Sequence, residues 1–350
     1  MRNTILQGDA LDQLRTLPDG CVQTCVTSPP YWNLRDYGMP GQIGLDPRPS
    51  DYVARIVAVF DEVRRVLRSD GTLWLNMGDG YSQDTKWGGA SGFRHTADKV
   101  GVYARPRARG SSGLKPKDLI GMPWRVAFAL QEAGWWLRSD IIWHKSNPMP
   151  ESVTDRPTKA HEYLFLLTKS ERYHYDAAAI REPLAEKTFT TFGIPHQAQG
   201  NDALGKVKSD NWGRTVGRRE PKVWKMPDGW DTGCGGHGAF HRQGREKGER
   251  REHEAFGANK RTVWTIATEA FPEAHFATFP QKLVEPCILA GSRIGDLVLD
   301  PFMGSGTVAL VARQWQRDYL GIELNPAYIE MAERRLACVQ PKLFANGLAG

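Results

Sequence analysis

The sequence predicts an α/β fold in which a parallel sheet is flanked by helices. Two observations predict it. Segments with apolar residues at helical spacing alternate with short apolar segments that are typical of buried strands. Two of those short segments run directly into a proline pair or a glycine-rich turn, which ends a strand at the sheet edge. The 350 residues, 40% of them hydrophobic, suffice to bury a large core in one domain or two.

The predicted helices and strands alternate along most of the chain. Ser50 is the predicted N-cap of the first long helix. The helices cover residues 50–68, 118–133, 281–291 and 307–317. The strands, which are short and apolar, cover residues 72–77, 135–144, 161–168, 296–300 and 319–324.

In the segment at 26–32, Val-Thr-Ser-Pro-Pro-Tyr-Trp, an apolar strand breaks abruptly into a rigid loop. Proline fixes φ and donates no backbone hydrogen bond, so a strand that meets two prolines must end there. The loop presents the Ser28 hydroxyl, the Pro29 carbonyl and the Tyr31 ring, with Trp32 next in sequence. The two oxygens can accept hydrogen bonds from an exocyclic amino group, and the ring can stack on a planar base. The alternative is a proline-rich turn that only ends a strand.

The segment at 296–307, Asp-Leu-Val-Leu-Asp-Pro-Phe-Met-Gly-Ser-Gly-Thr, has the pattern of a strand, a glycine-rich turn and a helix. Glycines at such a junction let the backbone approach a ligand closely, and the start of the helix offers free amide donors. The next predicted strand ends in Glu323, an acid suited to the two hydroxyls of a ribose. Because the GxG spacing lacks the third glycine of a dinucleotide fingerprint, we expect a cofactor with a ribose but no phosphate.

Taken together, these motifs resemble those of the amino-group DNA methyltransferases that use S-adenosylmethionine. The resemblance covers most of the chain outside residues 181–260. In that family an SPPY or DPPY tetrapeptide holds the target base in the catalytic site. The resemblance therefore implies four catalytic residues, Ser28, Pro29, Pro30 and Tyr31.

The resemblance also implies the residues that bind S-adenosylmethionine. The FxGxG motif holds the methionine part, Asp300 lies under the amino acid end, and Glu323 takes the ribose hydroxyls. The segment at 275–280 packs beside the methionine, and the segment at 8–10 meets the adenine end. The implied cofactor-binding residues are Asp9, Ala10, Phe279, Asp300, Phe302, Gly304, Gly306 and Glu323.

The order of the motifs is that of the circularly permuted beta group of this family, because the base-binding motif comes first and the cofactor motif last. The implied fold is a circularly permuted, Rossmann-like, S-adenosylmethionine-dependent methyltransferase fold with an inserted target-recognition region. The implied division is a catalytic half at 1–180 with a basic loop at 80–117, a target-recognition region at 181–260, and a cofactor-binding half at 261–350.

The implied activity is direct methyl transfer from S-adenosylmethionine to an exocyclic amino group of a base flipped out of double-stranded DNA. Serine at the first position of the tetrapeptide goes most often with cytosine-N4 methylation, and adenine-N6 methylation is the alternative. No metal is expected. The resemblance is compatible with a cognate restriction endonuclease as partner, with a monomer or a homodimer, and with the cytoplasm of a bacterial or phage-infected host cell.

Two stretches lack hydrophobic periodicity. Residues 80–117 are rich in Gly, Ser, Lys and Arg, and we interpret them as a basic arm near the DNA, with a solvated insertion as the alternative. Residues 181–260 combine Arg and Lys with isolated aromatic residues, a mixture that contacts phosphates and bases. We place target recognition there, with a flexible linker as the alternative. The net charge of +6 is compatible with a polyanionic partner without requiring one.

Two candidate sites of other kinds are disfavoured. Cys234, His237 and His241 have zinc-like spacing, but a closed structural zinc site needs four ligands. Cys287 follows a proline, as the nucleophile of carbon-5 cytosine methyltransferases does, yet it lies in an apolar helical pattern. We therefore expect Cys287 to be a packed core residue.

Other functional classes fit the sequence less well. Glutamine and RNA methyltransferases usually carry NPPY after the cofactor motif, whereas here Ser28 comes first and before that motif. A noncatalytic DNA-binding module would have no use for the glycine turn or Glu323. The five scattered cysteines are typical of free thiols in a reducing cytoplasm, and the sequence has neither a signal-peptide pattern nor an apolar run of about 18 residues. We therefore expect neither export nor membrane insertion.

Overall fold

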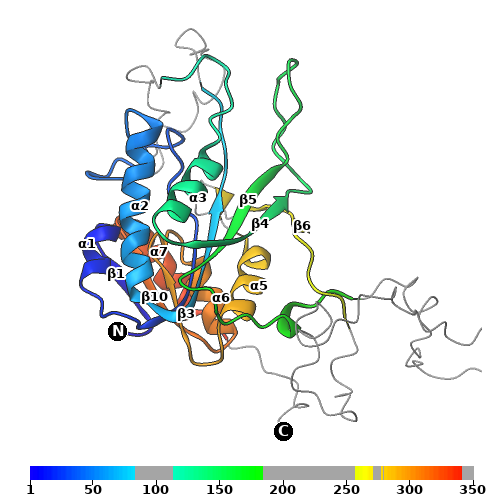
Figure 1. Cartoon of the computed structure of the whole chain (residues 1–350). Coiled ribbons are helices and arrows are strands. Elements are labelled where there is room, and N and C mark those ends of the chain that lie inside the picture. Colours follow the sequence, from blue (N-terminus) through cyan, green and yellow to red (C-terminus); the bar gives the residue numbers. More distant parts are fainter. Residues whose placement is uncertain (83–112, 184–256, 271–276, 279, 341–350) are drawn as a thin grey trace, which may run out of the picture. The chain divides into compact units, whose positions relative to one another are not determined.

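The computed structural model describes residues 1–82, 113–183, 257–270, 277–278 and 280–340 (Figure 1). The chain divides into two units, Met1–Arg181 together with Asn259–Gly350, and Glu182–Ala258. Most of the second unit lies outside the described residues, and with it the predicted target-recognition region and the candidate zinc ligands.

The first unit is built on an eight-stranded mixed sheet with the strand order β1-β10-β9-β2-β3-β5-β4-β6. Its strands are β1 (Thr4–Gln7), β2 (Val22–Thr27), β3 (Leu67–Met77), β4 (Trp136–His144), β5 (His161–Thr168), β6 (Val263–Thr265), β9 (Leu297–Asp300) and β10 (Asp318–Glu323). A separate pair consists of β7 (Glu269–Ala270) and β8 (Ala277–Thr278).

The sequence predicted parallel strands throughout, and β5 departs from this because it is antiparallel to both of its neighbours, β3 and β4. The reason is the connection. A parallel return needs a crossover, usually a helix, and residues 145–160 between β4 and β5 form no helix. The chain therefore turns back beside the strand that it has just left.

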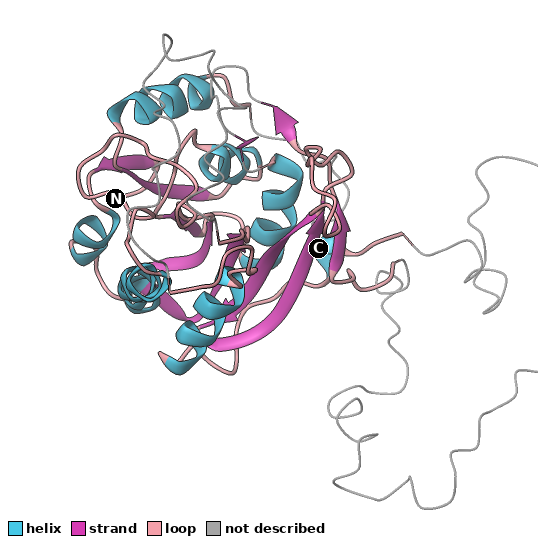
Figure 2. Cartoon of the chain, turned by 90° about the horizontal axis from the view of Figure 1, so that it is seen from above, coloured by secondary structure: helices cyan, strands magenta, loops and turns pink. Residues whose placement is uncertain are grey.

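Helices cover both faces of this sheet (Figure 2). One face packs against α1 (Ala10–Arg15), α2 (Pro49–Val66) and α3 (Met122–Glu132). The other packs against α5 (Gln281–Gly291), α6 (Thr307–Gln314) and α7 (Pro326–Ala337). A short 3-10 helix, η2 (Ala178–Ile180), contacts α5. No helix in the described part of the chain is long and apolar enough to cross a membrane.

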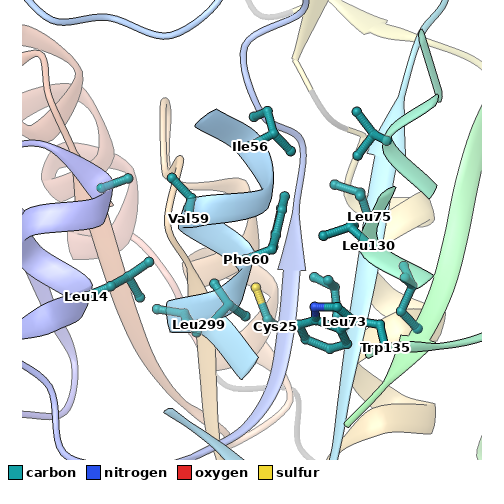
Figure 3. Close-up of a cluster of buried hydrophobic side chains, with 14 of the residues drawn as sticks. Leu14, Cys25, Ile56, Val59, Phe60, Leu73, Leu75, Leu130, Trp135 and Leu299 are labelled. Atoms are coloured by element: carbon teal, nitrogen blue, oxygen red, sulfur yellow. The ribbon is translucent and has the colours of Figure 1, made fainter. Parts of the chain in front are cut away.

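Two hydrophobic cores lie on opposite faces of the sheet. Alternate residues of a strand point to opposite faces, so Leu73 and Leu75 join the first core with Phe60 and Leu130 (Figure 3), whereas Trp74 between them joins the second. The second core also contains Cys287. That residue is fully buried, which confirms it as a packed core cysteine.

Several element ends differ from the predictions. Ser50 is not a cap, because α2 begins at Pro49, whose fixed φ suits the first helical position, and its N-cap is Arg48. β3 starts at Leu67, directly after α2, and not at residue 72. The two ends of the basic loop at 80–117 approach each other through the Tyr81–Leu119 bridge, and its residues 83–112 lie outside the described part.

The sheet brings together motifs that are far apart in sequence. β1 pairs in parallel with β10, and β2 pairs in parallel with both β3 and β9. The carboxyl ends of these parallel strands lie at one edge of the sheet, where ligands bind in open α/β folds. Thr27 ends β2, Asp300 ends β9, and a 2.6 Å hydrogen bond from Thr27 Oγ1 to Asp300 Oδ1 joins residues 273 positions apart.

Candidate active site

A cavity of about 400 Å³ lies at this edge of the sheet, where the segments after β1, β2, β9 and β10 converge. Its size is typical of a small-molecule site. Most of the predicted catalytic and cofactor-binding residues line it, namely Asp9, Ala10, Ser28, Pro29, Pro30, Tyr31, Asp300, Phe302, Gly304 and Glu323. Phe279 lies outside the described residues, and Gly306 is not part of the lining.

Gly306, which does not line the cavity, has a structural task in the turn. It is the N-cap of α6 with a φ of +81°, a left-handed conformation that favours glycine. A Cβ atom at this position would lie 2.7 Å from the Cβ of Ala332 in α7. The second glycine of the turn therefore allows α6 and α7 to pack closely.

Glu323, at the end of β10, braces the glycine turn. Its Oε2 accepts a 2.7 Å hydrogen bond from the Gly304 amide, and its Oε1 accepts a 2.8 Å bond from the Asn325 amide. Burial raises the pKa of the Glu323 carboxyl. A carboxylate has about four lone-pair sites, so these two bonds leave Glu323 able to accept further hydrogen bonds from hydroxyl groups in the cavity.

Asp300 is buried at the cavity floor, with 4% of its surface exposed. Its Oδ1 accepts hydrogen bonds from the Thr27 hydroxyl at 2.6 Å and the Phe302 amide at 3.0 Å. Burial, which outweighs these bonds, raises the pKa of Asp300 to about 7. A ligand that carries a positive charge beside Asp300 would favour its ionised form.

We expect the buried Asp300 to make stability depend on pH. The unfolded chain releases this proton near pH 4 and the folded protein near pH 7, so the free energy of unfolding falls as pH rises between those values. Asp300→Asn keeps an oxygen for Thr27 and Phe302 and removes the ionisation. Urea unfolding should show the variant gaining roughly 3 kcal/mol over the unaltered protein between pH 5 and pH 8. Equal pH slopes for the two proteins would contradict this assignment.

Asp9 and Ala10 lie at the start of α1, where the strand β1 feeds into the cavity wall. The Asp9 side chain accepts hydrogen bonds from the amides of Leu11 and Asp12, so it is the N-cap of this helix. The acid predicted to meet the adenine end therefore also fixes the helix beside the cavity.

The loop after β2 forms the other side of the cavity. Ser28 Oγ lies 3.3 Å from Asn76 Oδ1 and 3.4 Å from the Tyr31 hydroxyl. The Tyr52 hydroxyl donates a 2.8 Å hydrogen bond to the Pro30 carbonyl and so anchors the loop to α2. The Pro29 carbonyl has no hydrogen-bond partner among the described residues.

Tyr31 and Trp32, the two aromatic residues of this loop, make different contacts. The Tyr31 hydroxyl donates to Glu162 Oε2 at 2.7 Å and lies 3.1 Å from Asn76 Oδ1. Burial, reinforced by the Glu162 charge, raises the pKa of Tyr31 well above its usual value, so its proton stays in place. Trp32 packs against the first core and donates to the Asp46 carbonyl. Trp32 is not among the residues that line the cavity.

Several residues that line the cavity were not predicted. They come from the adjoining ends of β3, β4 and β5 and from the segment after the tetrapeptide, and they include Arg35, Tyr37, Asn76, Trp143, Lys145 and Glu162. Each lies at or beside the end of a predicted strand or in a loop, where a polar residue is ordinary. The pairing of β3, β4 and β5 places Asn76, Trp143, Lys145 and Glu162 together.

The chain matches the family model described as DNA methylase, N6_N4_Mtase, over residues 22–334. The chain therefore belongs to the N6/N4 amino-group DNA methylase family, among the type II DNA methyltransferases. It is 45% identical to type II methyltransferase M.Cfr9I of Citrobacter freundii over 95% of this chain and 87% of the relative. It is 41% identical to M.SmaI of Serratia marcescens over 95% of this chain and 90% of the relative.

Solved structures show the same fold. PvuII DNA methyltransferase (cytosine-N4-specific) aligns with a TM-score of 0.56 at 17% identity, over 99% of this chain and 89% of that one. A putative DNA modification methylase of Thermus thermophilus, complexed with S-adenosyl-L-methionine, aligns with a TM-score of 0.51 at 22% identity, over 95% and 94%. The predicted α/β fold of the DNA methyltransferases is confirmed.

Proposed function

We propose that this DNA methyltransferase transfers a methyl group from S-adenosyl-L-methionine to the exocyclic N4 amine of a cytosine flipped out of double-stranded DNA. The observation that carries the proposal is the pair of acceptors in the cavity wall, the Ser28 hydroxyl and the Pro29 carbonyl. The Pro29 carbonyl accepts no hydrogen bond from the described residues. Ser28 and Pro29 thus offer two acceptors for the two hydrogens of an amino group. The serine in place of an aspartate is the reason for preferring cytosine.

The opposite wall of the cavity suits the cofactor. Glu323 can take the ribose hydroxyls, and Asp300, buried at the floor, can face a positively charged amino acid end. Phe302 and Gly304 belong to the glycine turn, which lacks the third glycine of a dinucleotide site. The turn therefore suits a cofactor that has a ribose but no phosphates. When bound, the cofactor supplies an electrophilic methyl group on a sulfonium.

On the base side, the protein's task is orientation. An aromatic amine is a poor nucleophile because its lone pair is delocalised into the ring. Hydrogen bonds accepted by Ser28 Oγ and the Pro29 carbonyl favour the pyramidal amine, whose lone pair can attack the methyl group directly, without a covalent enzyme intermediate. The methylated amine then releases one proton to solvent. Orientation of this kind in a pocket sheltered from water supplies several kcal/mol. A base inside a duplex cannot reach the cavity, so it must be flipped out.

The order of the motifs, the composition of residues 181–260 and the similar proteins support three further proposals. The base-binding loop precedes the cofactor turn, which supports the permuted beta group. Residues 181–260 supply target recognition. Because the similar proteins are type II methyltransferases, we also propose a cognate restriction endonuclease that acts on the same DNA sequence.

The methylated base tests the proposal directly. DNA from a host that expresses the protein should yield N4-methyldeoxycytidine after digestion to nucleosides and mass spectrometry, and DNA from a host with the empty vector should not. N6-methyldeoxyadenosine in its place would establish the alternative, adenine methylation by the same two acceptors. Sequencing of the modified positions would give the recognition sequence.

A further inference from the structure

The end of the Tyr31 side chain meets an ion pair that the mechanism above does not use. Glu162 Oε2 lies 2.7 Å from the Tyr31 hydroxyl, and Glu162 Oε1 lies 2.5 Å from Lys145 Nζ. The side chains of Glu162 and Lys145 are only 14% and 19% exposed. All three residues line the cavity. A largely buried charge pair therefore stands in direct contact with the base-binding loop.

The antiparallel pairing of β4 with β5 creates this ion pair. Glu162 lies opposite Trp143 in the register, and Lys145 follows β4 with its amide donating to the Ala160 carbonyl at 2.8 Å. Lys145 Nζ also lies 4.8 Å from the centroid of the Trp143 ring. The ammonium is therefore fixed by a carboxylate and by an aromatic face.

A glycine makes room for the contact between Glu162 and Tyr31. Gly78 follows β3, and a Cβ atom built on it would lie 2.6 Å from Tyr31 Cε2 and 3.3 Å from Glu162 Cδ. The Tyr31 ring and the Glu162 carboxylate thus occupy the space that any side chain at position 78 would need.

Stability does not explain a charge pair at this place. Removing two charges from water costs free energy that their attraction often fails to recover, and apolar residues of similar size commonly serve stability as well or better. The contacts of Asn76 indicate another role for the ion pair of Glu162 and Lys145. Asn76 Nδ2 donates to the Tyr163 carbonyl at 3.1 Å, which fixes Oδ1 as the atom facing Ser28 and Tyr31.

Two hydroxyl groups therefore lie within reach of Asn76 Oδ1, Ser28 at 3.3 Å and Tyr31 at 3.1 Å, and the two hydroxyl oxygens lie 3.4 Å from each other. The Tyr31 proton can thus point to Asn76 Oδ1, to Ser28 Oγ or to Glu162. The Tyr31 hydroxyl has a single proton, and its contact with Glu162 is both shorter and charge-assisted. When Tyr31 donates to Glu162, Asn76 Oδ1 is left to accept from Ser28.

We propose that Glu162, held by Lys145, is a positioning residue for methyl transfer, which draws the Tyr31 proton away from both Ser28 and Asn76, so that Ser28 donates to Asn76. The Ser28 oxygen then presents its lone pairs, and not its proton, to the exocyclic amine. The inference rests on the proposed methylation of an amine. Without Glu162, the Tyr31 proton turns to Ser28 Oγ or to Asn76 Oδ1. There it occupies a lone pair of the Ser28 oxygen, or of the oxygen to which Ser28 donates, and the Ser28 hydroxyl is less well oriented to accept from the amine.

The test compares Glu162→Gln, Tyr31→Phe and the double variant. The amide introduced by Glu162→Gln can donate to the Tyr31 oxygen and turn the Tyr31 proton toward Asn76. We expect single-turnover methyl transfer to unmethylated plasmid DNA to fall about 100-fold, the size typical of a misplaced reacting group. Tyr31→Phe removes the competing hydroxyl and should cost less. In the double variant, Tyr31→Phe should restore much of the rate that Glu162→Gln loses.

Three further measurements separate positioning from general damage. Glu62→Gln removes an ion-paired glutamate on α2, 2.7 Å from Arg65 Nε and outside the cavity lining, and should leave the rate unchanged. Because Glu162→Gln leaves the Lys145 ammonium unpaired, Lys145→Met/Glu162→Gln is measured beside it and should show the same loss and the same rescue by Tyr31→Phe. Calorimetric affinity for S-adenosylmethionine should stay within a few fold in every variant.

Additive losses from Glu162→Gln and Tyr31→Phe, with no rescue, would overturn the positioning role while the methylation stands. Weakened cofactor binding in step with the rate would also overturn it, because the pair would then be structural. An unaltered enzyme that methylates no exocyclic amine would overturn the proposed function together with this inference.

Discussion

Ser28→Ala should lower the rate of methyl transfer by about two to three orders of magnitude, the loss typical of removing one preorganised hydrogen-bonding group. The Ser28 hydroxyl lies in the cavity wall, 3.3 Å from Asn76 Oδ1, and alanine supplies no acceptor in its place. Tyr31→Ala should have an effect of the same order, because it removes the ring that fills the space beside Gly78 as well as the hydroxyl. Both changes lie on the base side of the cavity.

Single-turnover methylation and calorimetric titration with S-adenosylmethionine check this expectation together. The cofactor affinity of both variants should stay within a few fold of the unaltered protein. Ser50→Ala, at an exposed position near the start of α2, is the matched control and should change neither quantity. Near-normal turnover in Ser28→Ala or in Tyr31→Ala would show that the catalytic loop has been wrongly assigned.

Glu323→Ala should instead weaken the binding of S-adenosylmethionine by about 10- to 150-fold, since hydrogen bonds to a charged group contribute roughly 1.5 to 3 kcal/mol. Two losses contribute to this change. The ribose hydroxyls lose an acceptor, and the amides of Gly304 and Asn325 lose the carboxylate that braces the turn. Glu323→Gln keeps one acceptor oxygen, and its affinity for S-adenosylmethionine should lie between that of Glu323→Ala and that of the unaltered protein.

Calorimetry on folded, cofactor-free protein measures this effect, with circular dichroism to verify folding. Glu330→Ala, at an exposed position of the neighbouring helix α7, serves as the matched control and should bind normally. Unchanged affinity in a folded Glu323→Ala protein would be incompatible with the ribose role.

The parts of the site that the sequence predicts are those that a few consecutive residues determine. The proline pair ends β2 beside Ser28, and Pro301 follows β9 directly, ahead of the turn at Gly304. Asn76, Lys145 and Glu162 escaped prediction because they meet only through the register of β3, β5 and β4, which local patterns do not reveal. Gly306 has a requirement that its motif did not reveal, which is close packing against Ala332.

The order of strands in the central sheet has a consequence for how the protein is made. β2 is buried along its whole length, between β3, which follows soon after it, and β9, which is translated far later. Until β9 emerges from the ribosome, one edge of β2 has no partner, and an unpaired apolar edge is prone to wrong association. The growing chain must therefore protect that edge during most of its synthesis. Since the glycine turn and Glu323 come with the last strands, an incomplete chain has half of a binding cavity and no means of methylating DNA.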